Sequence, residues 1–208
     1  MLTGLFTGTT RIRSLTLPVF PLRTVLFPGG LLPLRVFEAR YMDMVKDCLK
    51  NGRGFGVCSI VAGAETGAPA AFSSVGTVAK IVNWDMPQLG ILNIITEGGS
   101  RFNATRREVA ASGLAEAEVT LLQEESPQSA PEPPVQLVEL LQKLIERVGA
   151  EHFGVDRCFD DANWVSYRLA EILPIKLSVK QRLLEVNDSE VRIRVIAEFL
   201  RLQGMIPR

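Results

Sequence analysis

Proline residues punctuate the first apolar segments of this chain and limit how those segments can pair. Residues 17–22 read Leu-Pro-Val-Phe-Pro-Leu, and residues 25–30 and 32–34 continue the pattern with Pro28 and Pro33. Proline has no amide hydrogen to donate, so within a sheet it is found at strand starts, sheet edges and bends. The sequence therefore predicts two short strands, residues 15–22 and 31–36, joined by a turn at Pro28-Gly29-Gly30.

A helix and five more strands are predicted after this opening. A helix is expected over residues 37–51, stopped by Gly52, because Phe37, Tyr41, Met44, Val45 and Cys48 recur at three- and four-residue steps. The period then changes to two, which predicts strands at residues 54–61, 75–84, 89–97, 102–111 and 114–123. Turns are expected at residues 86–88, 98–100 and 112–113, with glycine supplying positive φ. These elements predict a small, mostly antiparallel pseudo-barrel with one helix.

The second half of the sequence has a helical pattern. Residues 124–134 contain four prolines and no large apolar residue, which predicts a linker. Helices are expected from Pro134 to Gly149, from Asp160 or Asp161 to Pro174, after a capping box of Ser178 with Gln181, and from Asp188 or Ser189 onward. The last helix is predicted to turn Val191, Val195, Ile196, Phe199 and Leu200 inward. We expect an α+β chain with a pseudo-barrel domain at residues 14–123, a linker at 124–134 and a helical bundle domain at 135–208.

The composition argues against several classes of protein. The 23 basic residues balance the 23 acidic ones and the isoelectric point is about 6.6, which is not typical of a nucleic-acid-binding domain. Three cysteines without a Cys-x-x-Cys pair and a single histidine match neither a disulfide framework nor a zinc site. We therefore expect no metal or other cofactor and a reducing, cytoplasmic location. The sequence also lacks the continuous apolar stretch of a signal peptide or membrane span.

Motifs for catalysis are missing from the sequence as well. No Gly-Lys dipeptide occurs, so the chain has no phosphate-binding loop of the P-loop type. None of the six lysines belongs to a serine–lysine peptidase motif, and His152 lies near a predicted helix end. Cys48 and Cys58 fall at core-like positions, whereas Cys158 beside Arg157 has the best case for reactivity. We expect no catalytic residues and no enzyme activity.

Apolar residues in predicted loops are the candidate binding residues. Phe72 lies in a segment, residues 62–74, with a single charge, and the turn at residues 84–89 brings Trp84, Met86 and Leu89 close together. Exposed apolar patches often mark interaction sites, and methionine adapts to varied partners. Two interpretations stay open: these side chains bind a polypeptide, or they fold back as a lid over the barrel. For Glu38 and Arg40, a structural ion pair is favoured over a contact with a bound polypeptide.

Several motifs of the chain match those of a known family. They comprise the opening residues Pro18, Phe20, Pro21, Pro28, Gly29, Phe37, Glu38, Arg40 and Tyr41, and the segments at residues 75–81, 90–94, 98–102, 169–174 and 180–185. In this combination the chain resembles the Lon protease N-terminal (LON substrate-binding) domain family. The resemblance implies a PUA-like pseudo-barrel, an all-α helical bundle after it, and binding of unfolded or damaged protein segments. The chain ends at Arg208 before an ATPase or peptidase could fit, so we expect a stand-alone, non-catalytic form.

The leading hypothesis is a polypeptide-binding module of bacterial protein quality control, which recognises apolar segments of unfolded or partner proteins. An adaptor or regulator that docks on a separate protease, or on another fixed partner, is the alternative. RNA binding through the PUA-like fold is a minor alternative, and the zero net charge weighs against it. No membrane partner is expected, and an unrecognised enzyme has the least support.

Overall fold

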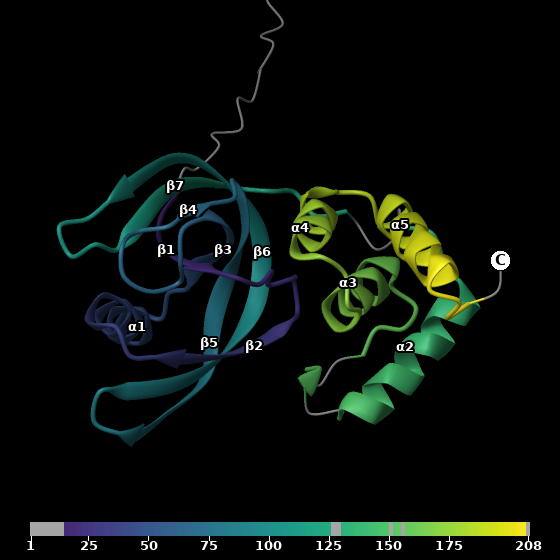
Figure 1. Cartoon of the computed structure of the whole chain (residues 1–208), viewed down its shortest axis with the longest axis horizontal. Helices are drawn as coiled ribbons and strands as arrows, with labels where there is room; N and C mark the ends of the chain where they lie inside the picture. The colour runs from purple at the N-terminus through teal and green to yellow at the C-terminus, as the bar shows by residue number, and fades with distance from the viewer. Residues whose placement is uncertain (1–14, 126–129, 150–151, 155–156, 207–208) are drawn as a thin grey trace, which may run out of the picture.

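The strands lie in the first half of the chain together with one helix, and the other helices form the second half (Figure 1), so the predicted α+β class is confirmed. The computed structural model describes residues 15–125, 130–149, 152–154 and 157–206. The strands are β1 (Leu15–Leu22), β2 (Leu31–Val36), β3 (Phe55–Ala62), β4 (Ala71–Phe72), β5 (Val75–Gln88), β6 (Ile91–Val109) and β7 (Ala115–Leu121). The helices are α1 (Ala39–Asn51), α2 (Val135–Val148), α3 (Ala162–Ile172), α4 (Leu177–Glu185) and α5 (Ser189–Leu202).

Five strands close into the expected pseudo-barrel. They follow the order β1-β7-β6-β5-β3, and a parallel pairing of β1 with β3 joins the two ends of this series. Helix α1 packs against the barrel, where Tyr41 stacks on Phe20 with 4.0 Å between ring centroids. The helix stops at Gly52, whose φ of 61° is a left-handed conformation that suits glycine. Phe37, predicted at the start of this helix, lies before it and is exposed.

Strand β6 runs without a break from Ile91 to Val109, so the hairpin predicted at residues 98–100 is wrong. Gly98 instead allows another segment to approach. The Gly29 amide donates to the Gly98 carbonyl at 2.6 Å, and the Gly98 amide donates to the Gly30 carbonyl at 2.9 Å. A Cβ atom on Gly98 would lie 2.2 Å from the carbonyl oxygen of Phe27. Glycine is therefore required here because residues 27–30 lie directly on β6.

The second half of β5 and the first half of β6 extend past the barrel as a hairpin (Figure 1). This hairpin turns at residues 89–90, where Gly90 has a φ of 85°, and not at residues 86–88 as predicted. Strand β2 pairs antiparallel with residues 92–97 of β6. The result is a three-stranded sheet, with β6 between β2 and β5, which we call the arm: residues 31–36, 80–88 and 91–97.

Most predicted helix boundaries in the second half are confirmed. Helix α2 follows Pro134 and ends at Gly149. The Asp161 carboxylate accepts a hydrogen bond from the Asn163 amide at the start of α3, and Asp188 caps α5 in the same way. Both are the usual role of aspartate at a helix N-terminus.

Two predictions about these helices are wrong. Helix α4 begins after Lys176 with no side-chain cap, and Gln181 donates to the Val75 carbonyl of β5 instead of closing a capping box with Ser178. On α5, Val195 is exposed while Arg192 is buried. A buried arginine was not foreseen because apolar periodicity assigns charged residues to the solvent side.

Two fully buried arginines join the helices to the barrel. Arg168 of α3 donates to the carbonyl oxygens of Gly29 at 2.6 Å and Pro28 at 2.7 Å. Arg101 of β6 donates to the Leu184 carbonyl at 2.8 Å. Hydrogen bonds to carbonyl oxygens offset the cost of burying a guanidinium, so these bonds hold the halves in one arrangement. They also fix the loop from which β2 enters the arm.

Candidate functional site

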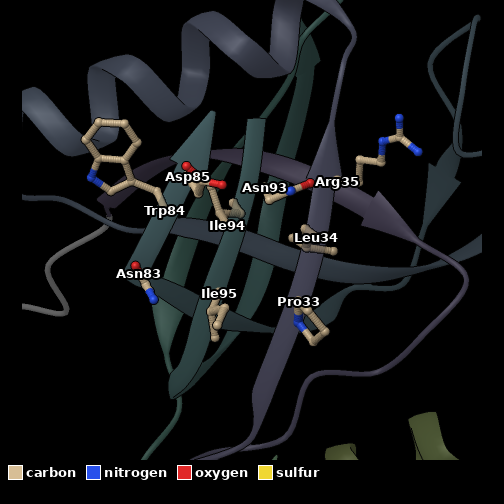
Figure 2. A pocket seen from close by; sticks show the side chains of 9 residues that line it. All are labelled: Pro33, Leu34, Arg35, Asn83, Trp84, Asp85, Asn93, Ile94 and Ile95. Carbon is tan, nitrogen blue, oxygen red and sulfur yellow. The ribbon is translucent and has the colours of Figure 1, made fainter. Parts of the chain in front are cut away.

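The arm carries a hollow of about 320 Å³ with a mostly apolar lining. Three residues from each strand line it (Figure 2): Pro33, Leu34 and Arg35 from β2, Asn83, Trp84 and Asp85 from β5, and Asn93, Ile94 and Ile95 from β6. Because it lies on a sheet and not between loops, its shape depends on the strand register.

The register explains why these nine residues meet. Paired residues on neighbouring strands share a face, and successive residues alternate between faces. One row across the sheet is Pro33, Ile95 and Asn83, and a second row on the same face is Arg35, Asn93 and Asp85. All six side chains are exposed. The row between them consists of Leu34, Ile94 and Trp84. By the same alternation, these residues belong to the opposite face of the sheet, where Ile94 joins the barrel core.

Three of the four predicted binding residues belong to the arm. Trp84 lines the hollow with 56% of its surface exposed, and Met86 and Leu89 follow toward the hairpin tip. Leu89 is 97% exposed at the turn itself. These three side chains do not fold back as a lid over the barrel, and the arm presents them to solvent.

Phe72 is not part of this surface. It lies on β4, only 6% exposed, and packs in a separate core cluster with Phe102. The guanidinium of Arg107 stands 4.8 Å from the centre of its ring and also donates to the Phe72 carbonyl at 2.7 Å. The low charge of residues 62–74 suggested an exposed loop, but β4 pairs with β3 and buries this ring.

Sequence reasoning missed the contributions of β2 and β6 to the hollow. Pro33, Arg35 and Ile95 were placed in predicted strands, and none of them was predicted to be a binding residue. One signal was available: the polar Asn93 and Glu97 fall on the same side of a strand as Ile95, which is typical of a strand with one solvent-facing side. The pairing of β2 with β6 is a long-range contact that no local pattern specifies.

Two charged side chains, Arg35 and Asp85, belong to the lining of the hollow. Arg35 stands on β2 and Asp85 on β5, at the two ends of one row. Within the described part of the chain, neither has an ion-pair partner. Further along the same face, Glu97 pairs in register with Lys80, so that these opposite charges lie side by side.

A second hollow of about 160 Å³ adjoins the first along β2 and shares Pro33, Leu34 and Arg35 with it. Its lining includes Phe37, 58% exposed, and the buried Tyr41. Burial raises the pKa of the Tyr41 phenol, so its hydroxyl stays neutral at physiological pH. Phe37 therefore offers apolar surface next to the arm, although it was predicted to have only a structural role.

Other candidate residues have structural roles. Glu38 forms an ion pair with Arg40 at 2.9 Å, and Arg40 also donates to the Gly113 carbonyl at 2.8 Å. This pair joins the start of α1 to the turn before β7. Burial raises the pKa of the Cys58 thiol to about 12, so a reactive thiolate does not form there at neutral pH. Among the described residues, no cluster of His, Cys, Asp or Glu is arranged to hold a metal ion.

Comparison with known proteins gives the family. A family model for the ATP-dependent protease La (LON) substrate-binding domain matches residues 16–201. The chain belongs to this family. The Lon N-terminal domain protein from Xanthomonas campestris, a solved structure, is 32% identical with a TM-score of 0.72, and the match covers 93% of this chain and 99% of that one. The N-terminal domain of the Mycobacterium avium complex Lon protease shares the fold, with 18% identity, a TM-score of 0.64 and coverage of 88% and 96%.

Lon proteases match over most of this chain. Lon protease 2 of Myxococcus xanthus is 26% identical over 193 residues, which are 88% of this chain, and Lon protease of Cytophaga hutchinsonii is 26% identical over 187 residues, or 85%. The chain spans 23% of the length of each of these relatives. None of the helices described for the chain has the length and apolar character needed to cross a membrane.

Proposed function

We propose that this protein binds apolar segments of unfolded polypeptides on the arm and catalyses no reaction. The observation that supports this most is the set of Trp84, Met86 and Leu89, held in solvent by a hairpin beside an apolar hollow. Burying apolar surface stabilises a complex by roughly 25 cal/mol per Å². A half-exposed tryptophan at the edge of a hollow that Ile95 and Pro33 also line is therefore a favourable contact for an apolar client side chain.

The setting of the arm supports a binding role for it. Arg168 donates a hydrogen bond to the loop before β2, and Arg101 of β6 donates one to the Leu184 carbonyl of α4. These bonds hold β2 and β6 in place, so the binding surface is formed before a client arrives. Preorganisation of this kind lowers the entropic cost of binding. The family match supports the choice of a polypeptide as ligand, and three cysteines without a Cys-x-x-Cys pair favour a reducing compartment such as the cytoplasm.

Binding of an unfolded protein tests this proposal. The probe is fluorescently labelled, reduced and carboxymethylated lactalbumin, and fluorescence anisotropy measures its affinity. We expect Trp84→Ser combined with Met86→Ser to weaken binding at least tenfold, or about 1.4 kcal/mol. Val195→Ser is the matched control, since it also removes an exposed apolar side chain, but from α5.

Two outcomes would contradict the proposal. One is an unchanged affinity of the Trp84/Met86 variant, and the other is an equal loss with Val195→Ser. Binding restricted to a single folded protein, with no affinity for the unfolded probe, would favour the adaptor alternative instead.

A further inference from the structure

We infer that the arm selects an apolar segment that has an acidic residue on one side and a basic residue on the other. This inference rests on the proposed function, because it names the chemical class of polypeptide that the same hollow would take. It is carried by two exposed charges, Arg35 on β2 and Asp85 on β5, which stand in the row next to the apolar Pro33 and Ile95 of the hollow.

The first step of the argument is the position of the two charges. Arg35 and Asp85 both pair in register with Asn93 of the central strand, so they lie in one row on one face. Two strand spacings separate them, which is roughly 10 Å between backbones. Figure 2 shows the Arg35 side chain reaching away from β6, so that its guanidinium stands farther still from Asp85.

The second step is that these charges are not compensated. The described residues form no ion pair with either one, and the residue between them, Asn93, is neutral. The other charges on this face, Glu97 and Lys80, are directly opposite each other on paired strands. The hollow therefore has a positive side at β2 and a negative side at β5, with the neutral Asn93 between them and the apolar Pro33 and Ile95 in the next row.

The third step is the size of the ligand. An extended chain rises about 3.3 Å per residue, so three to five residues span the distance from Asp85 to Arg35. A client that places apolar residues over Pro33 and Ile95 would bring its flanking residues to the two charges. Complementary charges there add selectivity and speed of association more than raw affinity.

Four synthetic peptides test the inference. Each has the same four apolar residues at its centre, and the flanks are Asp-Asp with Lys-Lys (the split peptide), acidic on both sides, basic on both sides, or Ser-Ser on both sides. At low ionic strength we expect the split peptide to bind about three- to tenfold more tightly than the acidic or the basic one. The preference should shrink at 0.5 M salt, because exposed charges are screened.

Charge-reversal variants make the test specific to these two residues. Arg35→Glu leaves two acidic sides and should change the preference to the basic peptide, and Asp85→Arg should change it to the acidic peptide. The double variant restores one charge of each sign and should again prefer the split peptide. Arg106→Glu, an exposed arginine elsewhere on β6, is the control for net charge and should leave the preference unchanged.

The result that overturns the inference is equal affinity for the split, acidic and basic peptides, or the same change in preference with Arg106→Glu as with Arg35→Glu. The proposed function is judged separately by the uncharged Ser-Ser peptide. If that peptide binds and Trp84→Ser abolishes its binding, the apolar site stands even when charge selectivity fails.

Discussion

The guanidinium of Arg168 donates a 2.6 Å hydrogen bond to the carbonyl oxygen of Gly29, although 139 residues separate them in the chain. A second bond reaches the Pro28 carbonyl, and Glu171 accepts a third at 3.0 Å. The Pro-Gly turn of the opening motif thus serves two purposes. It connects β1 to β2, and it is the point at which helix α3 holds the barrel.

Removing Arg168 tests how much this contact contributes. Arg168→Ala leaves two carbonyl oxygens and the Glu171 carboxylate without their buried donor, so we expect the free energy of unfolding to fall by about 3 kcal/mol or more. Urea denaturation measures it. Arg194→Ala is the control, because it breaks an exposed pair with Glu190 and should cost less than about 0.5 kcal/mol. Equal effects of the two substitutions would show that the buried contact contributes little.

Gly98→Ala tests the close approach of the loop to β6. The new Cβ atom would lie 2.2 Å from the Phe27 carbonyl oxygen, and relieving that overlap should lower the free energy of unfolding by about 2 kcal/mol. Thermal unfolding compares it with Gly154→Ala, where nothing lies within 4 Å of the added atom. We expect Gly154→Ala to be neutral or slightly stabilising. A stable Gly98→Ala protein would contradict the account of β6.

Local signals were sufficient for most elements of this fold. The spacing of apolar residues located the helices and strands within a few residues. Local signals for helix starts and ends did the same: Gly52, Gly149, Pro134 and Asp161. Prediction failed where a distant contact decides the role of a residue. Gly98 was interpreted as a turn because its partner, Phe27, is remote in sequence.

The same contrast between local signals and distant contacts applies to the candidate site. Trp84, Met86 and Leu89 were found because apolar residues in a turn stand out locally, whereas Pro33, Arg35 and Ile95 join them only through the register of β2 on β6. Phe72 was misjudged because its burial depends on β3 and β6. The division into domains at residues 124–134 stays a prediction.

Glu171 gives the stability of the fold a pH dependence. Burial raises the pKa of its carboxyl from 4.5 to about 7, against the opposing effects of Arg168 and Lys180. Between these two values the folded state binds more protons than the unfolded state, so this group makes the fold less stable as the pH rises from 4.5 to 7.

Glu171→Gln removes that titration. Relative to this variant, the wild type should lose on the order of 3 kcal/mol of unfolding free energy between pH 4.5 and 7.5. Urea denaturation of both proteins across this range measures the difference. Parallel pH profiles would mean that Glu171 has an ordinary pKa in the folded state.

Thiol reactivity checks the burial of the cysteines. Burial raises the pKa of both Cys48 and Cys58, and Cys158 is exposed. We expect one thiol per folded chain to react quickly with Ellman's reagent and three after unfolding. Cys158→Ser should abolish the fast reaction. A fast reaction that persists in this variant would place a second thiol at the surface.

The most direct test of a binding arm is to map amide chemical shifts by NMR during titration with the unfolded lactalbumin probe. We predict that the largest changes occur at residues 33–35, 83–89 and 93–95. Changes centred on the helices at residues 162–202, with the arm unaffected, would contradict the account.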